Sequence, residues 1–260
     1  MNTEVLNLWE SEGSTKITAY IPENKTSDCA IVILPGGAYM SRAPHEGKGY
    51  AEFFTKNGIT SFVVDYRVAP EQFPLPLLDS RRAIKYVRYY SDKYGINKNK
   101  IAVMGSSAGG HLAALTSTYF EKIEGDSCDE IDNEDFIPNA QILCYPVIKL
   151  LGKGIAHLGS GKYLLGERHA EMGEELSPDI IASERTPKAF IWHTAADQAV
   201  NVINSLDYAK KLKNVGVSTE LHIFPDGSHG LGLADGEDDV QRHVSQWSEL
   251  LLKWLRYINF

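Results

Sequence analysis

The chain has 260 residues, of which 43% are hydrophobic and 23% charged, with 22 glycines and three cysteines. These proportions are those of an ordinary globular protein, and they exclude a disordered, collagen-like or disulfide-scaffold chain. The net charge of −8 argues against a nucleic-acid partner, and the apolar runs fall far short of the roughly 20 residues of a membrane span.

Segments with strand-like and helix-like patterns alternate along most of the chain. The strand-like segments are short apolar or alternating runs at residues 17–21, 29–34, 61–66, 101–104, 140–145, 189–193 and 219–224. The helix-like segments cover residues 46–57, 76–94, a stretch ending near 120, 202–215 and 240–257. Three of these helices stop at a glycine, which is a common helix terminator.

Strands that are apolar on both faces and are separated by helices indicate a parallel sheet covered by helices on both sides. The strands that precede the first helix suggest that the sheet begins with antiparallel strands. We therefore predict an α/β fold with a mostly parallel sheet of about eight strands, in a single domain spanning residues 1–260. Between residues 148 and 187 the alternation stops and glycines become frequent, which predicts a small lid insertion.

Most of the negative charge lies in residues 121–135, which hold eight acidic side chains and one lysine, a net charge of −7. We interpret this stretch as a solvated surface loop. It lacks the spaced ligands, central glycine and closing glutamate of an EF-hand, so it does not indicate a calcium loop. No other segment shows metal-ligand spacing, and we expect neither a metal nor a cofactor.

The three cysteines are Cys29, Cys128 and Cys144, an odd number, and two of them lie in apolar strand-like runs. This distribution is not a disulfide framework. Residues 1–10 lack the basic and apolar regions of a signal peptide. Both observations predict a cytoplasmic protein.

The strongest chemical motif is Gly-Ser-Ser-Ala-Gly at residues 105–109. It follows a short apolar strand and opens a helix, which is the context of a nucleophile elbow. The tight turn needs small residues two positions before and two positions after the nucleophile. Only Ser107 meets this requirement, because Ser106 would have Met104 as a flank. A glycine-rich turn without catalysis is the alternative interpretation.

A serine hydroxyl needs a general base before it can attack a carbonyl carbon. His229 is the best candidate, because it lies in a loop just past a late strand. His193 and His111 are interpreted as packing residues. The other histidines lack a comparable setting: His45, His157, His169, His222 and His243.

The base in turn needs a carboxylate to orient it, and Asp197 is the candidate. It follows the strand at 189–193 by four residues. The chain order Ser107, Asp197, His229 is the order of the α/β-hydrolase triad. Asp226 is the alternative acid, although its closeness to His229 in sequence favours a turn-capping role.

The segment Pro-Gly-Gly-Ala-Tyr at residues 35–39 comes directly after an early strand. Glycines in such a loop let backbone N–H groups approach a ligand closely. We assign the N–H groups of Gly37 and Ala38, together with that of Ala108, to an oxyanion hole. One such donor is typically worth roughly 3 kcal/mol of transition-state stabilisation.

Together these residues resemble the α/β-hydrolase superfamily, and within it the bacterial carbohydrate-esterase and acetylesterase branch near the hormone-sensitive-lipase-like esterases. The resemblance is carried by LPGGAY at 34–39, DYRVAP at 65–70, GSSAGGH at 105–111, HTAAD at 193–197 and HIFPDGSHG at 222–230. It implies a carboxylic ester hydrolase acting on acetyl groups of sugars or xylan. The chain departs from the His-Gly-Gly-Gly form of the family, since Pro35 and Ala38 replace its histidine and third glycine.

We predict a serine carboxylesterase that hydrolyses short-chain, acetyl-type esters through an acyl-enzyme. Its partner is a small-molecule ester, with an acetylated sugar favoured, and self-association into a homo-oligomer is compatible with the sequence. Tyr39, Tyr145 and Tyr163 are the candidates to line the pocket or stack on a sugar. The alternatives are a serine peptidase and a non-catalytic small-molecule binder with the same fold.

Overall fold

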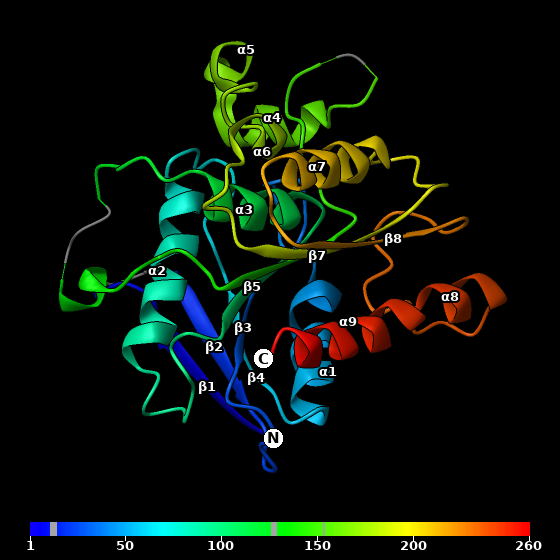
Figure 1. Ribbon diagram of the computed structural model, residues 1–260. Coiled ribbons are helices and arrows are strands. Elements are labelled where there is room, and N and C mark those ends of the chain that lie inside the picture. The colour runs from blue at the N-terminus through cyan, green and yellow to red at the C-terminus, as the bar shows by residue number, and fades with distance from the viewer. Residues whose placement is uncertain (11–14, 126–128, 153) are drawn as a thin grey trace.

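The computed structural model describes residues 1–10, 15–125, 129–152 and 154–260. Its strands form one eight-stranded sheet in the order β1-β2-β4-β3-β5-β6-β7-β8 (Figure 1). The strands are β1 (Asn2–Asn7), β2 (Lys16–Ile21), β3 (Ala30–Leu34), β4 (Thr60–Val64), β5 (Ile101–Ser106), β6 (Ala140–Cys144), β7 (Lys188–Thr194) and β8 (Thr219–Phe224).

The sheet is mostly parallel, as the sequence predicts. β1 pairs antiparallel with β2, and β2 pairs antiparallel with β4, whereas every other neighbouring pair is parallel. The central strands β3, β5 and β6 are buried at every position, because helices cover both of their faces. β1 was not predicted, since this edge strand is largely exposed and has no apolar run.

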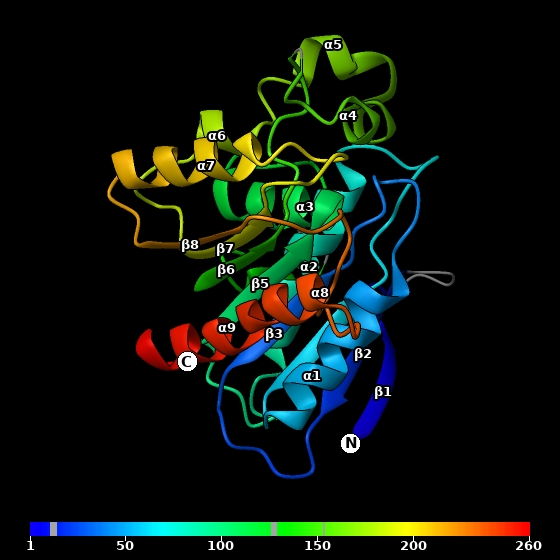
Figure 2. The ribbon, with the colours of Figure 1, turned by 90° about the vertical axis from the view of Figure 1, so that its right-hand side faces the viewer.

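Helices cover both faces of the sheet, with α1 and α9 on one face and α2, α3 and α7 on the other (Figures 1 and 2). The helices are η1 (His45–Gly49), α1 (Tyr50–Lys56), α2 (Leu75–Tyr89), α3 (Ser107–Thr118), η2 (Glu130–Asn133), α4 (Leu158–Leu165), η3 (Gly166–Arg168), α5 (His169–Met172), α6 (Pro178–Ile181), α7 (Ile203–Asn214), α8 (Asp239–Val244) and α9 (Gln246–Tyr257). Alternate residues of the strands therefore enter two separate cores.

Two of the predicted helices differ in detail from those in the structure. The segment predicted as a helix over 46–57 begins with the π-helical turn η1, and π-turns are frequent at functional sites. The segment predicted over 240–257 is divided into α8 and α9 at Ser245.

The acidic stretch is solvated in part, since Glu121, Glu124, Glu130 and Asp135 are exposed, but two of its aspartates are not. Asp129 and Asp132 form ion pairs with Arg82 of the buried helix α2, and Asp132 also pairs with Lys85. The side chain of Asp132 is only 2% exposed. These charges therefore neutralise cations of α2 instead of facing water, and the charge count alone could not show that pairing.

Cys29 and Cys144 are buried free thiols, and burial raises the pKa of Cys144 to about 12. Cys128 lies outside the described residues.

The segment between β6 and β7 carries the short helices α4, η3, α5 and α6. Figure 1 shows α4 and α5 beyond α3, and α6 beside α7. Several bonds tie the segment to the rest of the fold. Among them, the backbone N–H of Phe73 donates to the carbonyl of Leu164, and His111 bonds the carbonyl of Leu176. Residue 153, within the predicted lid, lies outside the described residues.

Candidate active site

The turn between β5 and α3 presents Ser107 at the carboxyl end of the central strand. Ser107 has a φ of 53°, the left-handed backbone of a strained elbow. A Cβ on Gly105 would lie 2.0 Å from the carbonyl oxygen of Gly109, and a Cβ on Gly109 would lie 2.1 Å from that of Leu34. Both flanking glycines are therefore required by close backbone approach, which is the physical basis of the sequence motif.

The structure brings Ser107, His229 and Asp197 together from three different strand ends. His229 Nε2 lies 2.8 Å from Ser107 Oγ, and His229 Nδ1 lies 2.6 Å from Asp197 Oδ2. An ionised carboxylate only accepts hydrogen bonds, so Nδ1–H donates to Asp197 and Nε2 is free to accept the serine proton. This chain of hydrogen bonds has the connectivity of a nucleophile, a base and an orienting acid.

Asp197 is held in its ionised form by its surroundings. Its side chain is fully buried, and its Oδ1 accepts hydrogen bonds of 2.9 Å from the backbone N–H groups of Ala199 and Val200. Burial by itself raises the pKa of Asp197, but the hydrogen bonds from His193, His229 and Val200 outweigh burial and hold the pKa well below its ordinary value. Asp226, the alternative acid, is exposed and does not occupy this position.

His193 has a supporting position that sequence reasoning missed. Its Nε2 lies 3.2 Å from Asp197 Oδ2 and 3.0 Å from the carbonyl of Val200, while its Nδ1 accepts from the hydroxyl of Ser205. The side chain is fully buried, as its interpretation as a packing residue implies. This N–H donor, which reaches the carboxylate in addition to that of His229, was not predicted, because four residues of sequence separation do not reveal the contact.

The loop after β3 faces the nucleophile with an unusual backbone. Gly37 has a φ of 138° and Ala38 a φ of 56°, and a Cβ on Gly37 would lie 2.2 Å from the carbonyl oxygen of Ser41. Both residues line the cavity that holds Ser107 and His229. Within the described part of the chain, no backbone acceptor pairs with the N–H groups of Gly37, Ala38 or Ala108. These three donors are therefore available to a ligand oxygen.

Tyr39 does not line this cavity, and its prediction as a pocket residue is wrong. It is completely buried, and its hydroxyl donates to His111 Nδ1 at 2.7 Å. His111 Nε2 donates to the carbonyl of Leu176 at 2.9 Å, and burial lowers the pKa of His111 to about 4. Tyr39 and His111 thus connect the loop after β3 to the segment between β6 and β7.

Tyr145 is also buried, and its prediction as a pocket residue is wrong for the same reason. Its ring packs edge-on against His229 with a centroid separation of 5.1 Å. Its hydroxyl donates to Glu46 Oε1 at 2.7 Å and accepts from the backbone N–H of Gly232 at 2.9 Å. Tyr145 therefore lies beneath the base and supports its loop.

Glu46 is a buried acid that sequence reasoning did not single out. Its Oε2 accepts from the backbone N–H of Gly36 at 2.7 Å, and its Oε1 accepts from Tyr145. A Cβ on Gly36 would lie 2.5 Å from Glu46 Oε2, so glycine is needed there for the carboxylate to reach the loop. Glu46, through Tyr145, thus joins the loop after β3 to the loop that carries His229.

The third predicted tyrosine, Tyr163, is 41% exposed on α4 and is not among the residues that line the cavity. Two histidines that have no distinctive sequence setting, His45 and His157, do line it. The cavity has a volume of about 320 Å³ and is lined by Gly37, Ala38, Met40, Ser41, Ala43, His45, Glu46, Ser107, His157, His229 and Gly230. Its lining comes from four separate parts of the chain.

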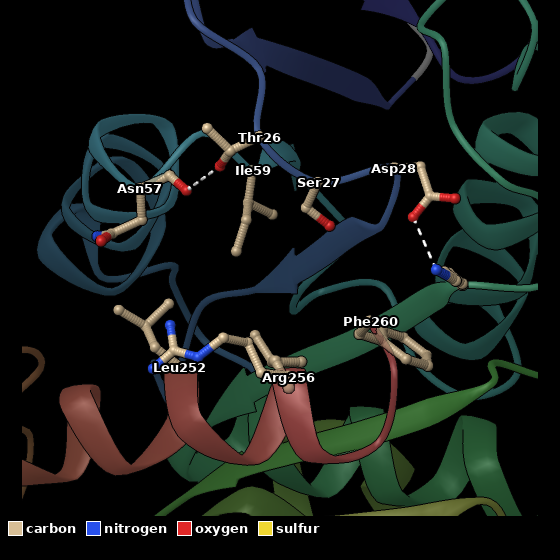
Figure 3. Close-up of a pocket in the computed structure, with 10 residues that line it drawn as sticks. Thr26, Ser27, Asp28, Asn57, Ile59, Leu252, Arg256 and Phe260 are labelled. Atoms are coloured by element: carbon tan, nitrogen blue, oxygen red, sulfur yellow. Dashed lines mark hydrogen bonds and ion pairs between the residues drawn. The ribbon is translucent and has the colours of Figure 1, made fainter.

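Another cavity lies away from the triad, between the loop that precedes β3 and the end of α9 (Figure 3). Its lysine, Lys100, forms an ion pair of 2.9 Å with Asp28, and Arg256 and Phe260 cover its other side. It contains no paired nucleophile and base. In the described part of the chain, no group of three histidine, cysteine or acidic side chains could hold a metal ion.

Among the described residues, no helix is both long enough and apolar enough to cross a bilayer.

Comparison with known proteins agrees with this geometry. The BD-FAE family matches residues 17–212. An acetylxylan esterase of Xylanibacter ruminicola is 33% identical over 251 residues, covering 93% of this chain and 49% of that protein. An endo-1,4-beta-xylanase B of Butyrivibrio fibrisolvens is 33% identical over 84% of this chain and 35% of its own length. The crystal structure of an acetyl ester-xyloside bifunctional hydrolase from Caldicellulosiruptor lactoaceticus has a TM-score of 0.90 and 40% identity, with coverage of 99% of this chain and 97% of that chain.

The fold and these similarities define an α/β hydrolase of the carbohydrate-esterase branch. The chain belongs to the BD-FAE family, whose match covers well over half of its length. The predicted superfamily and fold are therefore confirmed. The chain spans about half of the length of the acetylxylan esterase and about a third of the length of the xylanase.

Proposed function

We propose that this chain hydrolyses short-chain carboxylic esters, acetyl esters of carbohydrates above all, with Ser107 as nucleophile. The observation that carries the proposal is the continuous hydrogen-bond chain from Ser107 through His229 to the buried carboxylate of Asp197. The similarity to an acetylxylan esterase and to an acetyl ester-xyloside hydrolase supports the acetyl group and the carbohydrate.

In the first half of the reaction, Ser107 Oγ attacks the ester carbonyl carbon while His229 Nε2 takes its proton. The carbonyl oxygen becomes an oxyanion, and the N–H groups of Gly37, Ala38 and Ala108 are placed to bind it. The protonated His229 then gives its proton to the leaving alcohol, and the acyl group remains on Ser107. Asp197 stabilises the positive charge on the imidazole throughout.

In the second half, a water molecule gives its proton to His229 and attacks the acyl-enzyme. The second tetrahedral intermediate collapses, Ser107 regains its proton and the carboxylic acid leaves.

We also propose that the unit with this activity is a single domain of residues 1–260, and that residues 148–187 form a lid, since His157 from this segment lines the cavity.

Glycoside hydrolysis receives no support from this site. It requires two carboxyl groups on either side of the scissile bond, typically about 5 to 10 Å apart. Glu46 is the one carboxylate among the described residues lining the cavity, and it is already bonded to Gly36 and Tyr145. The xyloside and xylanase activities in the names of two relatives are therefore not proposed for this chain.

The test is hydrolysis of 4-nitrophenyl acetate, butyrate and octanoate by the wild type and by Ser107→Ala. We expect turnover of the short esters, and a loss of about 10⁴-fold or more in the variant, since removal of a nucleophile has effects of this size. Ser106→Ala is the matched control, and its loss should be far smaller because its hydroxyl bonds Tyr50 beneath the sheet edge.

Covalent labelling checks the nucleophile independently. Diethyl 4-nitrophenyl phosphate should phosphorylate the wild type once, at Ser107, with release of one 4-nitrophenolate, whereas Ser107→Ala should not react. Wild-type protein that neither turns over an ester nor takes up the label would overturn the esterase and favour a binder. Cleavage of peptide amides in place of esters would favour the peptidase.

A further inference from the structure

Two histidines lie in the cavity beside the triad, and neither has a part in the mechanism above. His157 comes from the segment between β6 and β7, and His45 comes from the start of η1. Both line the same cavity as Ser107 and His229. Each has one ring nitrogen bonded to the protein, and that bond fixes what the other nitrogen can do.

The bond that His157 makes leaves it a hydrogen-bond donor. Its Nδ1 accepts from the backbone N–H of Ser160 at 3.2 Å, capping α4, and lies 2.9 Å from the hydroxyl of the same residue. A backbone N–H can only donate, so Nδ1 carries no proton and the proton of the neutral ring lies on Nε2. In the described part of the chain, no hydrogen-bond partner holds this Nε2–H.

The His157 ring also stays neutral. Burial lowers its pKa, the positive charge of protonated His229 lowers it further, and the negative charge of Asp197 opposes both. The ring therefore offers a donor without adding a charge to the cavity.

The bond that His45 makes leaves it a hydrogen-bond acceptor. Its Nε2 lies 2.9 Å from the carbonyl oxygen of Gly230, which can only accept, and 3.8 Å from Glu46 Oε1. The proton of the neutral ring therefore lies on Nε2, and Nδ1 keeps its lone pair. The His45 side chain is 57% exposed, so this lone pair is within reach of a ligand at the cavity mouth.

Both histidines line the cavity from which the alcohol must leave. The acyl carbon bonds Ser107 and its oxygen faces the loop of Gly37, whereas the leaving oxygen must approach His229 Nε2 to receive a proton. His157 lines the cavity together with His229, and His45 is bonded to Gly230, the residue that follows His229. Groups attached to the leaving oxygen therefore meet these two rings.

We propose that His157 and His45 form a subsite for the alcohol part of the ester, in which Nε2–H of His157 and Nδ1 of His45 bind hydroxyl groups beside the acylated oxygen. A donor and an acceptor together match a sugar, whose hydroxyls both accept and donate. This inference rests on the proposed function, because it concerns the alcohol that the esterase releases.

The experiment compares two acetate esters of similar size: methyl mono-O-acetyl-β-xylopyranoside, which has free hydroxyls, and cyclohexyl acetate, which has none. The readout is the ratio of their kcat/KM values. In wild type we expect the sugar ester to be favoured, and each lost hydrogen bond should lower the ratio about 10-fold.

The variants are chosen to preserve the local structure. His157→Asn keeps a side-chain acceptor for the N-terminus of α4, since asparagine is a good cap, but its short amide does not replace Nε2–H. His45→Gln keeps a donor for the carbonyl of Gly230 but loses the ring acceptor. His222→Asn is the control: this histidine bonds Glu220 on β8, outside the cavity, and the ratio should not change.

Three outcomes are distinct. A fall in the ratio for both cavity variants, with no change for His222→Asn, supports the subsite. Equal losses on both esters, or no change in the ratio, overturn the subsite while the esterase stands, provided that Ser107→Ala removes activity. Wild-type protein that hydrolyses neither ester overturns the esterase, and the subsite with it.

Discussion

The strand ends and the cavity rim of this protein are built by different means. At the strand ends, Ser107, Asp197 and His229 each follow a strand of one sheet and converge within hydrogen-bond distance. At the rim, His45 and His157 come from a π-turn and from a long connection between strands. The proposed triad is thus held by the sheet, and the proposed subsite for the alcohol is held by local caps and loops.

This difference has a physical basis in the parallel sheet. The carboxyl ends of the parallel strands all meet at one edge of the sheet. The loops after β3, β5, β7 and β8 therefore bring their side chains together there, whichever helices cover the sheet. No strand pairing fixes the positions of His45 and His157 at the rim in this way. A substitution at the strand ends should therefore alter the chemical step, while a substitution at the rim should alter selectivity between substrates.

The largest effect that tests the comparison is expected from Asp197→Asn. Loss of the carboxylate charge would leave the imidazolium unstabilised and favour the wrong tautomer of His229. We expect kcat to fall about 10⁴-fold with little change in KM, as in other triads of this kind. The measurement is steady-state hydrolysis of 4-nitrophenyl acetate. Asp226→Asn, at the exposed alternative acid, should retain activity, and a comparable loss there would contradict the assignment.

The next effect concerns stability and the buried histidine that links the two regions. Burial lowers the pKa of His111 to about 4, against about 6.5 for an ordinary histidine. Between these values the unfolded chain binds more protons than the folded chain, so stability falls as the pH falls from about 6.5 to about 4. The contribution of this residue over that window is about 3 kcal/mol.

Urea unfolding at pH 7 and pH 4.5 would measure this contribution. In His111→Gln, which does not titrate, the loss of unfolding free energy between the two pH values should be clearly smaller than in wild type. An equal loss in the two proteins would show that His111 is not the group that causes the pH dependence of stability. Its bonds to Tyr39 and Leu176 would then not prevent protonation of the folded protein at this ring.

A smaller effect is expected from Glu46→Gln, which tests whether the two catalytic loops depend on one buried acid. The amide can still accept from one loop but places an NH₂ group toward the other, and one weakened hydrogen bond costs about 1 kcal/mol or somewhat more. We expect kcat to fall about 10-fold, since Glu46 and the Tyr145 hydroxyl accept from the N–H groups of Gly36 and Gly232 and so set the loop positions.

Tyr145→Phe tests the same network from its other end, because it removes only the hydroxyl. If Glu46 and Tyr145 act as one unit, the double variant should lose no more kcat than the worse single variant, and a double-mutant cycle measures this coupling. Fully additive losses would show that the acid and the tyrosine support their loops independently.

The sheet and the triad positions could be predicted from the sequence because each rests on local signals. Apolar runs predicted seven of the strands, the spacing of Gly105 and Gly109 singled out Ser107, and the order of motifs singled out Asp197 and His229. Close backbone approach allows only glycine at the two flanking positions, so the constraint is visible in the residues themselves.

The rim and the supporting groups could not be predicted because their roles arise from contacts distant in sequence. Glu46 bonds a tyrosine 99 positions away, and His45 bonds a carbonyl 185 positions away. Nothing in the residues around them marks these partners. The aromatic side chains were assigned to the pocket by residue type alone, and two of the three are buried behind it.

The smallest expected effect tests whether the position of a large side chain at the rim, and not its residue type, determines contact with the substrate. Met40 and Tyr163 are both large and well exposed, at 54% and 41%, but only Met40 lines the cavity. Met40→Ala removes apolar surface that an ester contacts, and losing about one methylene of contact should raise KM for 4-nitrophenyl butyrate about 4-fold. Tyr163→Ala should change KM less than about 2-fold, which is the scale of a surface substitution. If Tyr163→Ala raised KM as much as Met40→Ala, the aromatic residue would meet the substrate after all, and α4 would have to lie closer to Ser107 during the reaction than it does in this structure.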